Sequence, residues 1–313
     1  MTTAPTFPAG FTARPTAIDD VEAVFRVVEA AHMADYGEVT SLEEMVQAWQ
    51  TKGPRGLVVL APTGEVIATG RVEHSPSGKY VLPIVNVLPE YHGRGIETAL
   101  LHLLEEQARQ ERTAHSPELF LAQVSGRNTA AQKILEQSEY SLHSVFQIME
   151  LTMQEAPPAP ASLEGIAIHH FRIGQDEQAV YEADEEAFID ERGKTPRTFE
   201  VWSRRLGMNT PHFDPTLWYV AWDDEQIAGT SMSEIADGRG ELHHLGVRRP
   251  WRRRGLGMAL LLRTLGECYR RGIHTVRLNV DGQSLTNAHL LYARAGFQVI
   301  NSYRNYEKRL PPE

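Results

Sequence analysis

The sequence predicts a mixed α/β (α+β) fold made of two tandem domains, each a largely antiparallel sheet flanked by helices. The chain has 313 residues, and a single hydrophobic core rarely serves more than about 250–300 residues. Three prolines near the middle, Pro157, Pro158 and Pro160, favour an extended chain and disfavour a helix. The same succession of predicted helices and strands occurs on either side of them, which is a repeat of domain size.

We therefore expect an N-terminal domain at residues 1–154, a Pro/Ala-rich linker at 155–164 and a C-terminal domain at 165–313. In the first domain, apolar residues recur with a helical period from Ala17 to Met33. Ser41 and Glu44 form a capping box for a second helix. Short apolar runs predict strands at 57–60, 66–73, 80–87, 119–124 and 145–152, with helices at 95–112 and 129–137.

The second domain copies this order. The same patterns predict strands at 166–171, 217–222, 226–235, 241–247, 275–280, 297–300 and 303–308, and helices at 175–190, 198–206, 255–271 and 285–295. Residues 223–225 make the turn of a hairpin, and Gly296 is placed to end the last helix. Each domain thus has one long helix after its fourth strand.

The composition is that of a soluble globular protein, with 42% hydrophobic and 23% charged residues. No apolar run approaches the roughly 20 residues that a membrane-spanning helix needs, so we expect no membrane partner. The N-terminus has neither the basic start nor the apolar stretch of a secretory signal, so we expect a cytoplasmic protein. Cys268 is the single cysteine, so no internal disulfide can form.

The net charge is −10, with 11 Lys+Arg against 20 Asp+Glu in residues 1–160 and 20 against 21 in the remainder. An acidic protein is a poor candidate for nonspecific nucleic-acid binding. The basic run from Arg248 to Arg254 keeps that rival open, but it carries no aromatic residue beyond Trp251. We expect no nucleic-acid partner, and a monomer or homodimer.

The basic run lies where a predicted strand ends at Val247 and a predicted helix begins near Gly255. Free N–H groups and the helix dipole attract anions there, glycine lets a phosphate approach the backbone, and arginines add charged donors. A pyrophosphate suits this arrangement. The run lacks the third glycine of the dinucleotide fingerprint and the Lys-Ser/Thr of the P-loop, so a tight turn with a solvated basic face is the alternative.

The pattern Arg252-x-x-Gly255-x-Gly257, after Val247, resembles motif A of the GNAT acetyltransferases. The resemblance implies a GNAT fold for each domain and acetyl-CoA as the acyl donor. Backbone groups of Leu245 and Val247 would pair with the pantetheine arm. The diphosphate would be held in the turn by Arg252, Arg253, Arg254, Gly255, Leu256, Gly257 and Met258.

Residues 280–297 resemble motif B of the same family, which ends Leu-Tyr-x-x-x-Gly-Phe. The family often has Asn where this chain has Ser284, which leaves that coenzyme contact to a serine. Tyr292 corresponds to a tyrosine near the coenzyme sulfur. Because a thiol has a reference pKa of about 8.5 and a tyrosine of about 10, a phenol can protonate a leaving thiolate. The alternative for Tyr292 is packing beside Phe297.

A protonated amine substrate also needs a proton acceptor, and the strand before the basic run carries candidates. Regular alternation would put Glu241, His243 and Leu245 on one face, and Leu242 and His244 on the other. Glu241 resembles an acidic residue that some GNAT enzymes use, and His243 titrates in the useful range. The alternative for each histidine is a hydrogen-bonded strand residue. No third ligand at suitable spacing makes a metal site.

The first half is a degenerate copy of the same motifs. Residues 87–101 match motif A, but His92 replaces the usual Arg or Gln and Glu97 replaces a small residue. A carboxylate about 5 Å from a phosphate charge is repelled by roughly 3 kcal/mol at an effective dielectric near 20. Leu135 stands where the second half has Tyr292, and leucine cannot donate a proton. We expect the first domain to be structural or to shape the substrate cleft; retained coenzyme binding is the alternative.

These observations predict an N-acetyltransferase that moves an acetyl group from acetyl-CoA to a primary amine of a small molecule or peptide by direct attack. The tandem arrangement resembles the mycothiol-synthase subgroup of the family. The alternative function is a non-catalytic acyl-CoA-binding or regulatory module, which would have had no reason to keep Tyr292.

Overall fold

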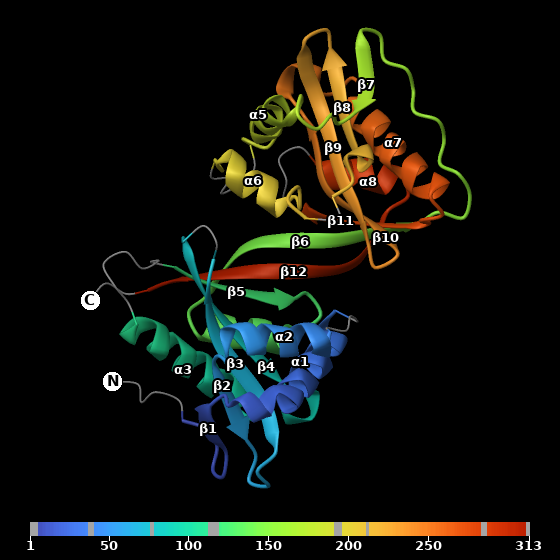
Figure 1. The fold of residues 1–313 in the computed structure, drawn as a ribbon. Helices are drawn as coiled ribbons and strands as arrows, with labels where there is room; N and C mark the ends of the chain where they lie inside the picture. The colour runs from blue at the N-terminus through green and yellow to red at the C-terminus, as the bar shows by residue number, and fades with distance from the viewer. Residues whose placement is uncertain are drawn as a thin grey trace. The chain divides into compact units, whose positions relative to one another are not determined.

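The computed structural model describes residues 6–36, 41–75, 78–111, 119–190, 196–210, 213–282 and 287–310. Within them the same order of strands and helices occurs twice (Figure 1). The first half runs β1 (Thr12–Pro15), α1 (Val21–Asp35), α2 (Leu42–Lys52), β2 (Leu57–Leu60), β3 (Val66–His74), β4 (Tyr80–Val87), α3 (Ile96–Gln110), β5 (Leu119–Ser125), α4 (Thr129–Gln137) and β6 (Ser141–Thr152).

The second half runs β7 (Ile166–His170), α5 (Glu177–Ala187), α6 (Phe199–Arg205), β8 (Trp218–Asp223), β9 (Gln226–Ala236), β10 (Arg239–Val247), α7 (Leu256–Arg270), β11 (Thr275–Asp281), α8 (Ala288–Arg294) and β12 (Gln298–Arg309). The mixed α/β prediction and the repeat are therefore confirmed. Two details were wrong: β1 was not predicted, and β12 is one strand where two short strands were expected. None of the described helices is both long and apolar enough to cross a membrane.

The chain packs into two compact units whose limits differ from the predicted domain boundaries. One unit holds residues 1–145 and 301–313, and the other holds residues 146–300. β12 pairs antiparallel with β5, and β6 pairs antiparallel with β11. Each half has therefore exchanged its last strand with the other. Alternation within a strand does not reveal its partner, and two copies of one fold offer equivalent places for the same strand.

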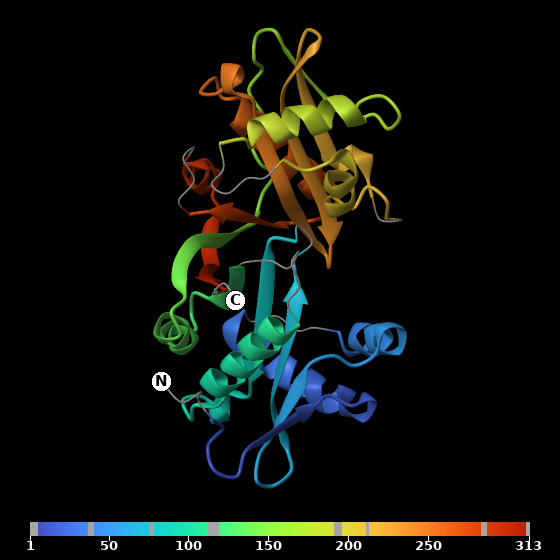
Figure 2. The ribbon, with the colours of Figure 1, turned by 90° about the vertical axis from the view of Figure 1, so that its left-hand side faces the viewer.

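In the second unit the strand order is β6-β11-β10-β9-β8-β7. Helices α5 and α6 cover one face of this sheet, and α7 with α8 covers the other (Figures 1 and 2). Trp202 of α6 is fully buried against Trp218 of β8. On the opposite face, Leu260 and Leu265 of α7 are also fully buried. Because both faces are covered, residues 227–233 of the central strand β9 are all buried.

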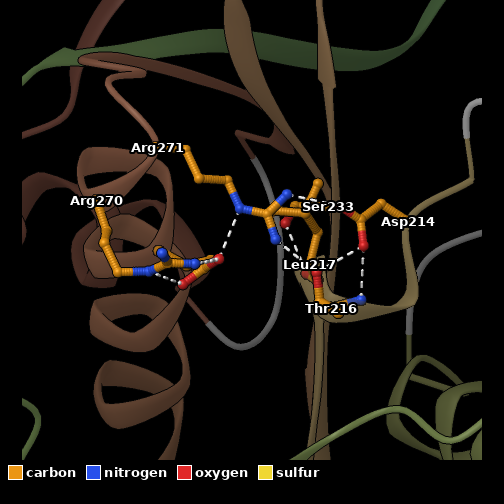
Figure 3. Close-up of polar contacts among 7 residues, drawn as sticks. Asp214, Thr216, Leu217, Ser233, Arg270 and Arg271 are labelled. Carbon is orange, nitrogen blue, oxygen red and sulfur yellow. Dashed lines mark hydrogen bonds and ion pairs between the residues drawn. The ribbon is translucent and has the colours of Figure 1, made fainter.

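The far end of α7 is tied to the chain that leads into β8 (Figure 3). Arg271, the residue after α7, donates from Nε to Glu267 Oε1 at 2.6 Å and from Nη1 to Asp214 Oδ2 at 2.6 Å. Its other Nη donates to the hydroxyl of Thr216. A cation at this position also complements the helix dipole. These contacts fix where α7 lies on the sheet, and so where its N-terminus meets the end of β10.

The first unit has the order β1-β2-β3-β4-β5-β12, and an ion pair inside it secures the exchanged strand. The Lys308 ammonium of β12 lies 2.9 and 3.0 Å from the two carboxylate oxygens of Glu105, which is 0% exposed on α3. Arg109 also donates to Glu105, at 2.9 Å. Tyr306, two residues before Lys308, is 0% exposed. Strand β12 is therefore part of the core of the first unit.

We predict that Lys308→Met destabilises the first unit by about 3 kcal/mol, because it leaves the buried Glu105 carboxylate short of one partner. Hydrogen–deuterium exchange should become faster in α3 and β5 and stay unchanged in α7 and β9. Arg26→Met is the matched control, since its pair with Glu65 is exposed and should contribute less than about 1 kcal/mol. Equal effects of the two variants would contradict this role for Lys308.

Candidate functional site

Strand β10 parts from its parallel neighbour β11 halfway along its length. The pairing covers Gly240 to Leu242 only, opposite Val276 to Leu278, although β10 continues to Val247. Arg248 N–H donates to the carbonyl of Ala228 in β9 at 3.0 Å. Because backbone groups alternate along an antiparallel ladder, those of Leu245 and Val247 point to the side that β11 has left. β10 therefore presents an open backbone edge that leads to the basic turn (residues 248–255).

The basic turn and the start of α7 expose unpaired amides. Gly255 caps the helix at φ 85°, and Arg253 has φ 62°. The first helical amide with an acceptor is that of Ala259, bonded to the Gly255 carbonyl at 3.0 Å. In the described part of the chain, the amides of residues 253–258 have no acceptor. Such a row of donors at the start of a 15-residue helix suits a polyanion.

The side chain of Arg252 stabilises this turn, because its guanidinium is bonded to groups within the protein. Nε donates to the Val247 carbonyl, Nη1 to Asp190 Oδ2 and Nη2 to the Ala187 carbonyl, each at 2.9 Å. Arg249 also pairs with Asp190. Arg249 first, and then Arg252, holds the pKa of the Asp190 carboxyl well below its usual range. The predicted coenzyme contact of Arg252 is thus available through its backbone rather than its side chain.

Of the remaining arginines of the run, one is bonded within the protein and two are not. Arg248 donates to Glu186 Oε2 at 2.8 Å and to the Ile227 carbonyl at 2.8 Å. Arg253 and Arg254 are exposed, and neither has a side-chain partner among the described residues. These two guanidinium groups are the cations free to meet an anion at the turn.

The predicted residues that follow in α7 contribute backbone and packing. Leu256 is 2% exposed and packs in the core with Tyr219 and Trp251, and Met258 packs in the cluster around Leu261. At Gly257 an added Cβ would lie 3.5 Å from Leu291 of α8. The first turn of α7 and helix α8 therefore lie close together, and a Cβ at Gly257 would meet Leu291 in ordinary van der Waals contact.

Tyr292 lies on α8, next to Leu291. Its ring meets Phe297 edge to face at 5.9 Å, and the residue is 7% exposed in the cluster that contains Leu261 and Leu265 of α7. The packing beside Phe297 that the sequence offered as an alternative is therefore present. Ser284 falls outside the described residues.

The predicted faces of β10 were wrong beyond Leu242, because a β-bulge interrupts the alternation. Leu242 is opposite Ser233 of β9, while His244 is opposite Met232, so His243 is the extra residue. Leu242 and Leu245 both pack against α7. His244 faces α5, with its ring 5.0 Å from that of Phe188. Glu241 therefore shares the α5 face with His244, and Leu245 does not.

Each candidate for proton transfer on β10 has a charged partner. Arg239 donates to Glu241 Oε1 at 2.5 Å. His243 Nε2 lies 3.0 Å from Glu234 Oε1, so both predicted groups are paired. His244 Nδ1 lies 2.8 Å from Asp184 Oδ2. No group of three potential metal ligands occurs among the described residues.

Asp184 was not singled out from the sequence, although a signal was present. It lies on the buried stripe of α5, between Val180, Ala183 and Ala187, and is 0% exposed. A carboxylate on the apolar stripe of a helix needs a buried partner, and here the partners come from α6 and β10. The spacing within α5 indicates burial, but only the structure identifies the partners.

The first-half turn (residues 88–95) has the same backbone shape and a different chemistry. Gly95 caps α3 at φ 83°, and His92 Nε2 lies 3.1 Å from the Val87 carbonyl, as Arg252 Nε does at Val247. Glu97, at the position of Gly257, accepts from the Gly93 amide through Oε1 at 3.2 Å. Its Oε2 is buried without a partner among the described residues. One donor of this turn, the Gly93 amide, is therefore already bonded to a carboxylate.

Comparison with known proteins gives consistent matches along the chain. The model of the acetyltransferase (GNAT) family matches residues 22–140 and 178–297. The mycothiol acetyltransferase of Thermobispora bispora is 30% identical over 291 residues, which cover 89% of this chain and 92% of the relative. That of Geodermatophilus obscurus is 28% identical over 289 residues, which cover 88% and 90%.

Two solved structures extend the comparison. A GCN5-related N-acetyltransferase from Sphaerobacter thermophilus is 34% identical, with a TM-score of 0.81 and coverage of 98% of both chains. A tandem GNAT protein from the clavulanic acid biosynthesis pathway has a TM-score of 0.68, covers 97% of this chain and 99% of its own, and is 17% identical. The second likeness is one of fold alone.

We predict that Arg252→Met lowers the free energy of unfolding by about 2 kcal/mol, because two carbonyls and one carboxylate lose a donor in a partly buried position. Urea unfolding followed by tryptophan fluorescence measures this, since four of the five tryptophans lie in the second unit. Arg253→Met, which removes an unpartnered exposed side chain, should change stability by less than about 0.5 kcal/mol. A similar decrease in the free energy of unfolding in both variants would contradict the role of Arg252 in stabilising the turn.

Proposed function

This chain belongs to the GNAT family of acetyltransferases, and we propose that its second unit transfers an acetyl group from acetyl-CoA to a primary amine of a small molecule or peptide. The row of unpaired amides at residues 253–258 carries this proposal. The chain is an acetyltransferase. Its curated relatives match it along most of its length, so both halves of the chain are shared with them. The non-catalytic alternative has no comparable support, because the curated relatives that match are named as enzymes.

The residues at the basic turn fit the coenzyme. The amides from Arg253 to Met258 would hold its diphosphate, and the free guanidinium groups of Arg253 and Arg254 would offset its charge. The open backbone edge of β10, at Leu245 and Val247, would pair with the pantetheine arm. The Val247 carbonyl already accepts from Arg252, so Leu245 has the larger share of that pairing. When bound, the coenzyme supplies an activated acetyl thioester.

Direct attack by the amine is supported by the state of the single cysteine. Cys268 is 0% exposed in the core of α7, and burial raises the pKa of its thiol to about 11. A buried protonated thiol is a poor nucleophile, so an acetylated cysteine on the path is disfavoured. The remaining requirements are a group that takes a proton from the amine and a group that gives one to the leaving thiolate. Tyr292 is our proposal for the second role.

The acceptor amine is proposed to approach from the α5 face of β10. Glu241 lies on this face, with Glu234 opposite it on β9 and Asp184 on α5, and carboxylates there favour a cationic amine. The curated relatives are named mycothiol acetyltransferases, so the cysteinyl amine that precedes mycothiol heads the panel of amines to assay. Thiol release from acetyl-CoA with that panel tests the proposed function. A protein that releases no thiol with any amine would refute it.

We propose that the first unit holds no coenzyme, because the Glu97 carboxylate is already bonded to the Gly93 amide of its turn. Its carboxylate would have to leave Gly93 and remain near the diphosphate, where like charges repel. The first unit would then serve as a partner in the strand exchange and as a support for the fold.

We predict one coenzyme A site per chain by calorimetry, and none in Gly257→Glu. The new carboxylate would stand where Glu97 stands in the first half, and its bulk would crowd Leu291. Gly266→Glu is the matched control, because it introduces the same residue into α7 where an added Cβ meets nothing within 4 Å. Undiminished affinity in Gly257→Glu would place the coenzyme elsewhere.

We predict that Tyr292→Phe lowers kcat about 100-fold, which is within the usual contribution of a general acid, while coenzyme affinity stays within twofold. The ring and its packing on Phe297 are kept, so the loss reports on the hydroxyl. Tyr269→Phe, the same change within α7, should leave kcat intact. Full turnover in Tyr292→Phe would remove that phenol from the mechanism.

A further inference from the structure

The side chains of Asp184, Trp202 and His244 form a hydrogen-bonded chain from the core of the second unit to the α5 face of β10. Asp184 Oδ2 accepts from Trp202 Nε1 at 2.9 Å and lies 2.8 Å from His244 Nδ1. Asp184 Oδ1 is buried without a partner among the described residues. A carboxylate only accepts hydrogen bonds, so Nδ1 of His244 is the donor. The neutral imidazole therefore presents the lone pair of Nε2.

The other neighbours of His244 are uncharged or already paired. Phe188, the residue after α5, packs on its ring, and Met232 of β9 lies opposite it across the ladder. On β10 itself, Glu241 is bonded to Arg239 and His243 to Glu234. Asp184 is thus the charged group in contact with His244. The side chain of His244 is 20% exposed, and its Nε2 has no partner in the described part of the chain.

The position of His244 along β10 matches the position of the chemistry in the proposed function, on which this inference rests. A pantetheine arm that leaves the basic turn passes Val247 and then Leu245. Its reactive end therefore reaches the bulge at residues 242–244. His244 is the residue there whose ring nitrogen is both fixed in its tautomer and free of a protein partner.

We propose that Nε2 of His244, positioned by Asp184, is the base that takes the proton from the attacking amine. The amine nitrogen forms its bond to the acetyl carbon, the carbon–sulfur bond breaks, and the amine proton passes to Nε2. The departing thiolate takes a proton from the phenol of Tyr292. One proton returned through water from His244 to Tyr292 resets both groups. Asp184 acts through His244 and is a positioning residue.

His244→Ala tests the base. Turnover should fall about 100-fold, the acid limb of the kcat/KM profile should disappear, and coenzyme affinity by calorimetry should stay within twofold. Added imidazole should restore part of the turnover. His169→Ala removes an exposed histidine of β7 and should change neither turnover nor its response to imidazole. Unchanged turnover, or a loss that imidazole does not reverse, would overturn the assignment.

Asp184→Asn tests the contribution of Asp184 without removing the base, and it decides the matter if His244→Ala does not fold. Oδ2 accepts from both Trp202 Nε1 and His244 Nδ1, so the carbonyl of an asparagine can keep both bonds, but it carries no charge to stabilise the protonated imidazole. We expect kcat to fall at least tenfold with the KM for acetyl-CoA unchanged. A normal kcat would overturn the role of Asp184. Wild-type protein without any turnover would instead refute the proposed function, and this inference with it.

Discussion

The side chain of Arg252 is the contact on which the basic turn depends. A turn that leaves six consecutive amides without acceptors cannot be stabilised by its own backbone, so it must be held from outside. Arg252 does this by joining the last carbonyl of β10, the last carbonyl of α5 and the carboxylate of Asp190. Its planar, five-donor guanidinium is suited to three acceptors in different directions. An arginine in an anion-binding motif can therefore serve the anion indirectly, by fixing the donors.

The two turns show how little chemistry separates a binding loop from a structural one. Both have a left-handed glycine before the helix and a side chain bonded to the end of the preceding strand. The difference lies in the first helical turn, where one has Gly257 and the other Glu97. A carboxylate at that point satisfies an amide within the chain, and the fold is kept without a ligand. The loss of a site thus need not destabilise the domain that carried it.

The repeat, the long helices and the basic turn could be predicted from the sequence, because periodicity and glycine positions encode them locally. The bulge in β10 could not be predicted. Three of the four residues from Glu241 to His244 are polar, so one extra residue does not visibly disturb the alternation of polar and apolar residues. The partners of Asp184 and the inward course of Arg252 depend on elements about 60 residues away in the chain. The exchange of β6 and β12 was hidden for another reason: each strand suits both places.

That exchange sets the order in which the protein can be completed during synthesis. The sheet of the first unit receives its last strand from β12, which is synthesised only after residues 126–297. Until then the edge of β5 has no neighbour, and Glu105 has no Lys308. Domains usually finish folding in the order in which they are made, but here the half made first is closed last. The nascent chain must therefore carry an unpaired strand edge, which is the feature that chaperones and aggregating chains recognise, through the synthesis of the whole second half.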